Sequence, residues 1–312
     1  YRMNSQLRFA ALAVVASLTF AGSVGAQPMS DGEACLEGSG RAHLDEAYCR
    51  RALSDPNLPA LERASLLTSR ASALLNLGDR AAAGTELARA LTLNPGSAQA
   101  YLLRGLLRRD AGPAAIGLVL ADMDRAISLN PFFAEAMAHR GAIHLQTGNQ
   151  SAALADFDRA LSIRPRASTA LFFKAVLRFQ QKRFAQAGVL FRRVLALAPV
   201  QHPIAVLWLA AAAAHQGGAA ERALEPYSWW WEDGVWPAPL VQLWAGTASA
   251  EAAAAAMTMQ GKDAQAQGAY FLAQWYLVNG DEAAAQELLG QVQQHPRRHM
   301  LEVIVAGSLY RD

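Results

Sequence analysis

The sequence predicts an all-α fold in which antiparallel helix hairpins stack into a solenoid. Alanine, the strongest helix former, supplies 67 of the 312 residues, against only 13 prolines and 23 glycines. A proline-terminated motif also recurs at intervals of 36, 34 and 34 residues, which is the period of a helix hairpin. Its four copies are Leu93-Asn94-Pro95, Leu129-Asn130-Pro131, Ile163-Arg164-Pro165 and Leu197-Ala198-Pro199.

Residues 1–26 have the pattern of a secretory signal peptide. Arg8 precedes an uninterrupted apolar run from Phe9 to Phe20, and the small residues Val24-Gly25-Ala26 predict cleavage after Ala26. Twelve apolar residues are too few to cross a bilayer, so this interpretation is favoured over an N-terminal membrane anchor. We therefore expect a periplasmic or secreted protein with no membrane span in its mature form.

Two cysteines, Cys35 and Cys49, enclose the turn residues Gly38-Ser39-Gly40. In an exported chain such a pair most often forms a disulfide, which would tether an N-terminal cap over residues 27–58 and stabilise it by roughly 3 kcal/mol. A metal or redox site is the alternative. No third cysteine or histidine stands at ligand spacing and no Cys-x-x-Cys is present, so we expect no metal.

The unit that begins at Ala134 shows how two helices would pack. Gly141 and Ala153 fall on facing helices and let them approach closely, with His144 and Phe157 filling the space beside them. Gly148 is expected to cap the first helix, and Pro165 to stop the second. The same positions recur in the units before and after.

The segments RGLLRRDAG, ADMDRAISLNP and RGAIHLQTGNQSAALADFDRALSIRP resemble the tetratricopeptide repeat (TPR). The resemblance implies a right-handed superhelical TPR solenoid with a concave binding surface, and four regular units over residues 59–200. One unit carries two extra residues between Gly112 and Leu120, including Pro113, which should lengthen its turn without breaking the stack.

Residues 201–312 are expected to hold degenerate helical repeats and a C-terminal capping helix. Hairpins are predicted over Ile204–Leu224 and Gln267–Val292, with a helix over Pro239–Ala245 and a second alanine-rich helix between the hairpins. Residues 230–310 resemble repeat adaptors of the Gram-negative envelope, which are lipid-anchored and dimeric, although Gln27 stands where a lipid anchor needs cysteine. The cluster Trp229 to Trp236 would either plug the solenoid or form the seam of a homodimer.

No motif for catalysis, a cofactor or nucleic acid is present. The histidines form no His-Glu-x-x-His motif, and only three of the 28 basic residues are lysines, without a polybasic run. Asp156 and Asp158 flank Phe157 as Asp122 and Asp124 flank Met123, and this recurrence favours a solvated face of each repeat over an acid pair.

The first helix of each unit is expected to line the concave surface as an apolar, partly aromatic groove. The notable alternative is that Phe172, Phe179 and Trp208 pack against a neighbouring unit. The expected groove residues are Leu102, Leu106, Arg109, Ala138, Ala142, Phe172, Val176, Phe179, Trp208, Tyr270 and Gln274.

These features favour a non-enzymatic scaffold or adaptor that binds a protein or peptide partner of the cell envelope through this groove, without a cofactor. The alternatives are a hydrolase-type enzyme with a site around His215, Glu232 and Asp233, and a purely structural or assembly role.

Overall fold

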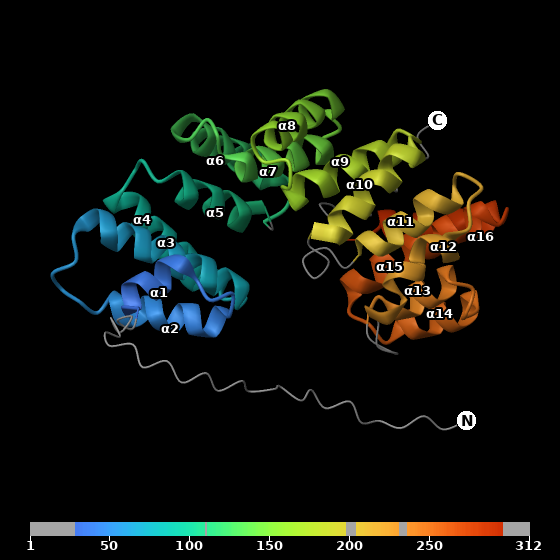
Figure 1. The fold of residues 1–312 in the computed structure, drawn as a ribbon, viewed down its shortest axis with the longest axis horizontal. Coiled ribbons are helices and arrows are strands. Elements are labelled where there is room, and N and C mark those ends of the chain that lie inside the picture. Colours follow the sequence, from blue (N-terminus) through green and yellow to red (C-terminus); the bar gives the residue numbers. More distant parts are fainter. Residues whose placement is uncertain (1–28, 110, 198–203, 231–235, 296–312) are drawn as a thin grey trace, which may run out of the picture.

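The computed structural model describes residues 29–109, 111–197, 204–230 and 236–295. All regular secondary structure in these residues is helical, and consecutive helices pair as antiparallel hairpins (Figure 1). Figure 1 shows the hairpins following one another along an arch, from α1 and α2 at one end to α13–α16 at the other. The predicted all-α solenoid of helix hairpins is therefore confirmed.

The N-terminal cap consists of α1 (Asp31–Glu37) and α2 (Ala42–Ala52). The four regular hairpins are α3 (Ala60–Asn76) with α4 (Arg80–Leu93), α5 (Ala98–Arg109) with α6 (Ile116–Leu129), α7 (Ala134–Gln146) with α8 (Gln150–Ile163), and α9 (Ser168–Gln180) with α10 (Phe184–Leu197). The remaining helices are α11 (Ala205–Ala214), α12 (Ala220–Leu224), α13 (Ala238–Trp244), α14 (Ala250–Thr258), α15 (Lys262–Val278) and α16 (Glu282–Gln293), with short 3-10 turns η1 (Pro113–Ala115) and η2 (Glu225–Trp230).

Small residues set how closely the two helices of a hairpin approach. A Cβ at Gly141 would lie 2.6 Å from Cε1 of Phe157 and 3.2 Å from the carbonyl oxygen of Ala153. Phe157 is fully buried at this contact. The close approach predicted for Gly141 and Ala153 is therefore confirmed, because only glycine leaves room for the phenyl ring.

The turns inside three of the hairpins repeat one hydrogen-bonding pattern. Gly148 adopts a left-handed φ of 80°, and the amide of Asn149 donates to the carbonyl of His144 across the helix end. The Asn149 side chain then accepts from the amide of Ala152 and begins α8. The pairs Gly78-Asp79 and Gly280-Asp281 do the same for α3–α4 and α15–α16. These turns fold back sharply because one residue ends a helix and the next starts another.

A ladder of ion pairs runs through the regular hairpins. Arg140 of α7 makes a two-point contact with Asp156 of its own hairpin, at 2.6 and 2.8 Å, and reaches Asp124 of the preceding one at 2.8 Å. These hydrogen bonds raise the pKa of the Arg140 guanidinium above its ordinary value. Asp156 is 5% exposed, as Asp122 is 3% exposed, so the solvated face expected for both carboxylates is wrong at these two positions.

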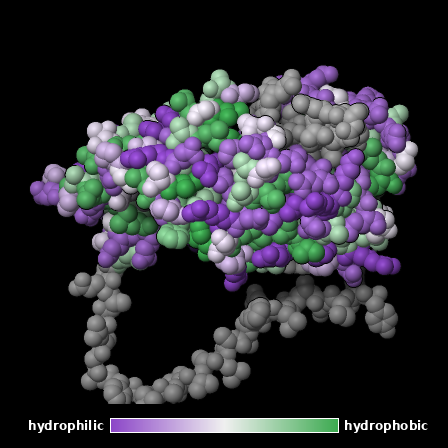
Figure 2. All heavy atoms as spheres, turned by 90° about the horizontal axis from the view of Figure 1, so that it is seen from above, coloured by the Kyte–Doolittle hydropathy of each residue, from purple (hydrophilic) through white to green (hydrophobic). Residues whose placement is uncertain are grey.

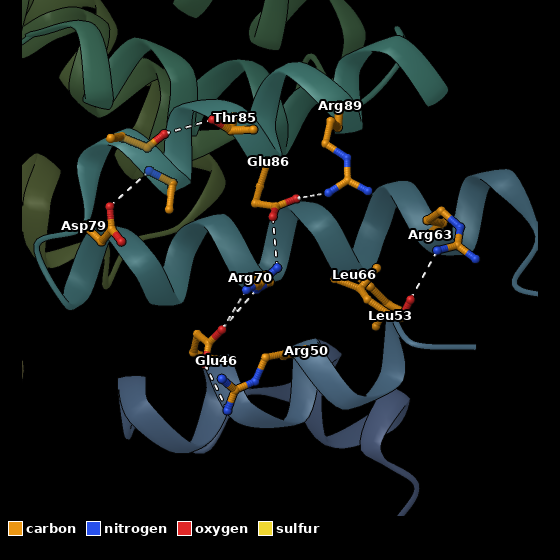
Figure 3. A network of polar contacts seen from close by, with 12 residues as sticks. Glu46, Arg50, Leu53, Arg63, Leu66, Arg70, Asp79, Thr85, Glu86 and Arg89 are labelled. Atoms are coloured by element: carbon orange, nitrogen blue, oxygen red, sulfur yellow. Dashed lines mark hydrogen bonds and ion pairs between the residues drawn. The ribbon is translucent and has the colours of Figure 1, made fainter. Parts of the chain in front are cut away.

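The same ladder joins the cap to the first repeat (Figure 3). Arg70 of α3 lies 2.9 Å from Glu86 of its partner helix α4 and 2.9 Å from Glu46 of α2. Glu46 therefore occupies the role that Asp124 has for Arg140, and α2 acts as the second helix of a preceding unit. The cap continues the solenoid as a shortened repeat.

The cap is closed by the disulfide between Cys35 and Cys49, whose Cα atoms are 4.7 Å apart. This bond confirms the pairing predicted from the sequence. Both cysteines are buried and pack with Leu66 of α3. The disulfide thus fixes α1 against α2 and places both helices on the first repeat.

The C-terminal helices fold back on the array. Trp208 of α11 lies 5.2 Å, centroid to centroid, from both Tyr270 and Phe271 of α15. This contact belongs to a continuous apolar core that extends from α7 to α16. The first helix of the last hairpin begins at Lys262, five residues before the predicted start at Gln267.

The second hairpin has the longer turn that its extra residues predicted, and η1 forms there before α6. Among the described residues, none of the helices is long and apolar enough to cross a bilayer. The predicted signal peptide of residues 1–26, Glu232 and Asp233, most of the Trp229 to Trp236 cluster, and the end of the chain after residue 295 lie outside the described residues.

Candidate functional site: the N-terminal cleft

The structure buries most of the residues that were expected to line an apolar groove. Leu106 and Arg109 are partly exposed, as is Ala142. The others have at most 6% of their surface exposed; they are Leu102, Ala138, Phe172, Val176, Phe179, Trp208, Tyr270 and Gln274. The expectation that these eight residues form an open groove is wrong.

Two packing arrangements account for this correction. Leu102 of α5 joins Met123 of α6 and Ala136 of α7 in one apolar cluster, so it closes a junction between repeats. Farther along, Phe179 packs edge-on against Trp208 at 5.1 Å, and α15 covers Trp208. Apolar side chains on the inner helices are therefore used to join successive helices.

His215 is part of the same packed region. Its Nε2 lies 2.8 Å from Oε1 of Gln274, and its ring stacks on Phe184 at a centroid distance of 4.6 Å. Burial lowers the pKa of His215, and the hydrogen bond to Gln274 acts in the opposite direction. These contacts give His215 a role in joining α11 to α15.

A polar cleft lies at the other end of the array, and we call it the N-terminal cleft. Its volume is about 300 Å³. It separates the cap from the inner faces of α3 and α5. The lining residues are Cys35, Leu36, Glu37, Gly38, Asp45, Thr68, Ser69, Ser72, Ala73, Asn76, Gln99 and Leu103.

The floor of the N-terminal cleft is one face of α3. Thr68, Ser72 and Asn76 are four residues apart, so their side chains lie one above another along the helix. Thr68 donates its hydroxyl hydrogen to the carbonyl of Ala64, whereas Ser72 and Asn76 face the cleft without such a bond within the described residues. Together with Gln99 of α5, they offer hydroxyl and amide groups to a ligand.

The wall of the cleft is the end of α1 and the turn that follows it. Gly38 and Gly40 both adopt left-handed φ angles, 70° and 72°, which reverse the chain between α1 and α2. Asp45 holds this turn by accepting hydrogen bonds from the amide and hydroxyl of Ser39, at 2.6 and 2.7 Å. The Cys35–Cys49 bond anchors the base of the wall.

The charges that line the N-terminal cleft are negative. Glu37 and Asp45 are its charged residues, and no lysine, arginine or histidine of the described chain lines it. The described residues also contain no group of three or more side chains that could hold a metal ion. The N-terminal cleft therefore offers a ligand hydroxyl and amide groups together with two carboxylates.

The sequence did not predict this cleft, because the binding surface was expected on the apolar residues of the inner helices. The available signal was the four-residue spacing of Thr68, Ser72 and Asn76, which places three uncharged polar side chains on one face of the helix. Figure 2 shows one face of the molecule, where apolar side chains form small separate areas among polar ones rather than a continuous stripe.

Two of the repeat units match a known family. The tetratricopeptide repeat model matches residues 64–97 and 134–166, which span α3–α4 and α7–α8. No curated protein gives a significant match.

Several solved structures resemble this chain at low sequence identity. PilF of Pseudomonas aeruginosa is 17% identical with a TM-score of 0.49, over 78% of this chain and 96% of that one. A tetratricopeptide repeat protein from Parabacteroides merdae is 16% identical with a TM-score of 0.48, over 89% and 97% of the two chains. PilW, a type IV pilus biogenesis factor, is 20% identical with a TM-score of 0.45, over 74% and 92%. The family match identifies the hairpins α3–α4 and α7–α8 as tetratricopeptide repeats, and the regular hairpins α5–α6 and α9–α10 follow at the same period of 34 to 36 residues.

Proposed function

We propose that this protein is an exported, non-enzymatic scaffold that holds an extended segment of a partner protein in its N-terminal cleft. The observation that carries the proposal is the open space between the disulfide-anchored cap and the polar face of α3. An extended segment brings unpaired backbone N–H and C=O groups, and the hydroxyl and amide side chains of the cleft can satisfy them.

Export to the periplasm or outside the cell forms part of this proposal. It is supported by the apolar run Phe9–Phe20 followed by small residues, and by a buried disulfide, because such bonds persist mainly in oxidising compartments. Mass spectrometry of the protein from a periplasmic fraction should give an N-terminus at Gln27 and an oxidised cysteine pair. A cytoplasmic protein with residues 1–26 still attached would contradict export.

The binding role is tested by filling the cleft. Ser72→Phe places a large ring over the floor of the cleft. Asn76→Arg fills the cleft with a long side chain, at an exposed position where the substitution puts folding less at risk. Ala88→Phe on the exposed side of α4 is the matched control. Each variant is used to capture partners from an envelope extract, after circular dichroism has verified its folding.

The proposal expects one partner to be recovered by the wild type and by Ala88→Phe, and to be lost or strongly depleted with both cleft variants. Recovery of the same partner in equal amounts by all four proteins would contradict a role for the N-terminal cleft.

A further inference from the structure

A second cavity lies at the far end of the array, and we call it the C-terminal cavity. Its volume is about 420 Å³. It is lined by residues from α11, α12, α13 and α15 and from the turns that follow them, which are Ala214, Gly217, Gly218, Ala219, Ala220, Glu221, Leu243, Trp244, Gly246, Ala248, Trp275, Val278 and Asn279. Neither the expected groove nor the N-terminal cleft includes these residues.

Three helices end at this cavity, and they end in the same way. Gly217 after α11, Gly246 after α13 and Gly280 after α15 have left-handed φ angles of 71°, 73° and 83°. In each case the amide of the following residue donates across the last turn: Gly218 to Ala213, Thr247 to Gln242 and Asp281 to Tyr276, at 2.9 to 3.0 Å.

The shared ending places the C-termini of three helices, which are the negative ends of their dipoles, at one cavity. Residues of all three terminal turns line the C-terminal cavity. Of these helices, α11 has 10 residues and α15 has 17, long enough for an appreciable dipole. The helix that begins at the cavity, α12, has only five residues, so its opposing positive end is weak.

Side chains add to the negative potential. Glu221 is exposed at the cavity and is its charged lining residue, and no described lysine, arginine or histidine lines the space. The cavity also has two indole rings, Trp244, which is 3% exposed, and Trp275, which is partly exposed. The faces of indole rings attract cations.

We propose that the C-terminal cavity binds an organic cation, a guanidinium or alkylammonium group. Such a group can lie against the Trp275 indole while its N–H groups donate to Glu221 and to carbonyl oxygens of the terminal turns. The cavity is large for a bare metal ion, and the described residues have no cluster of metal ligands there. This site is separate from the N-terminal cleft and does not depend on the function proposed for it.

The cationic group can belong to an arginine or lysine side chain of a protein or to a free small cation. Isothermal titration of the full, oxidised chain with N-acetyl-arginine methylamide tests the guanidinium group in a peptide-like setting, and agmatine tests the free cation. N-acetyl-citrulline methylamide is the matched neutral compound, because it has nearly the same shape without the charge.

Two variants test the named groups. Glu221→Gln removes the carboxylate charge at an exposed position, and Trp275→Leu removes the indole face at a partly exposed one. Glu62→Gln in the exposed first turn of α3 loses the same charge far from the cavity, and Ser72→Phe blocks the N-terminal cleft alone.

The proposal expects saturable binding of at least one of the two cations, no binding of the citrulline compound, and affinity weakened about fivefold or more by Glu221→Gln and by Trp275→Leu. Both control variants should bind as the wild type does. The stronger binder of the two cations identifies the source of the ligand. Equal binding of the citrulline compound, unchanged affinity in Glu221→Gln or Trp275→Leu, or no binding of either cation would overturn the proposal.

Discussion

Arg70 shows how much of this fold depends on single charged residues. Its guanidinium joins Glu46 of the cap to Glu86 of the first repeat, and the side chain of Glu86 is only 9% exposed. A carboxylate at such a position is stable because it is paired, and it becomes costly when its partner is removed. The ion pairs of the ladder thus hold neighbouring helices together.

Replacing this guanidinium tests its role. Arg70→Met should lower the free energy of unfolding by about 2 kcal/mol, because the buried Glu86 side chain would be left with Arg89, at 3.1 Å, as its ion-pair partner. Arg51→Met removes an exposed ion pair with Asp31 and should lower the free energy of unfolding much less, because solvent screens the two charges. Urea titrations of both variants measure the difference, and equal effects would show that burial of Glu86 does not matter.

His139 makes the stability depend on pH. Burial, together with repulsion from Arg109, lowers its pKa to about 4. In the unfolded chain the imidazole of His139 takes up a proton with a pKa near 6.5. The contribution of neutral His139 to the free energy of unfolding is therefore fully present above about pH 6.5 and is lost as the pH falls through about 4.

Between about pH 7 and pH 5 the free energy of unfolding should therefore fall by about 1 to 2 kcal/mol through this group. His139→Gln should flatten the dependence in that range, whereas His43→Gln, at an exposed position, should leave it unchanged. Urea titrations at several pH values decide this, and an unaltered slope in His139→Gln would exclude His139 as its source.

At the scale of elements, the periodic signals in the sequence predicted the hairpins well. The proline-terminated motifs mark the ends of α4, α6, α8 and α10, because proline cannot continue a helix and its spacing fixes the length of each unit. The disulfide was predictable because only two cysteines exist.

The groove was not predictable in the same way. The spacing of Phe172, Val176 and Phe179 indicates that they share a helix face, but it does not indicate which helix will cover that face. Burial of Trp208 depends on α15, which lies more than fifty residues farther along the chain. The N-terminal cleft likewise depends on where the disulfide places α1.

One turn departs from the glycine pattern and provides a test. Lys182 has a left-handed φ of 56° at the place where Gly78, Gly148 and Gly280 end the corresponding helices, and the amide of Arg183 makes the same bond to Arg178. Lys182→Gly should raise the free energy of unfolding by about 1 kcal/mol, since glycine adopts this conformation without a steric penalty.

Gly148→Lys, the reverse change in the preceding hairpin, should lower the free energy of unfolding by a similar amount, about 1 kcal/mol. Thermal unfolding of both variants gives the comparison. Destabilisation by Lys182→Gly would mean that the lysine side chain contributes more than its backbone costs.

At the scale of the whole molecule, the repeats form a continuous support with a cavity at each end, and a different ligand is proposed for each. The N-terminal cleft depends on a disulfide and an ion pair that fix the cap to α3. The C-terminal cavity depends on three helix ends that converge because α15 folds back onto α11. Between them, the apolar residues of the inner helices join consecutive repeats.

The central claim is that a partner segment lies in the N-terminal cleft, and site-specific photo-crosslinking in living cells tests it most directly. A photoreactive phenylalanine is placed at Leu36 or Gln99, which are exposed lining residues of the cleft, and, as the control, at Ala88 on the exposed side of α4. The account predicts a discrete crosslinked product from both cleft positions, with mass spectrometry locating the bond in one segment of one protein, and no such product from position 88. Crosslinks only from position 88, or none from the cleft while the protein is folded and oxidised, would contradict it.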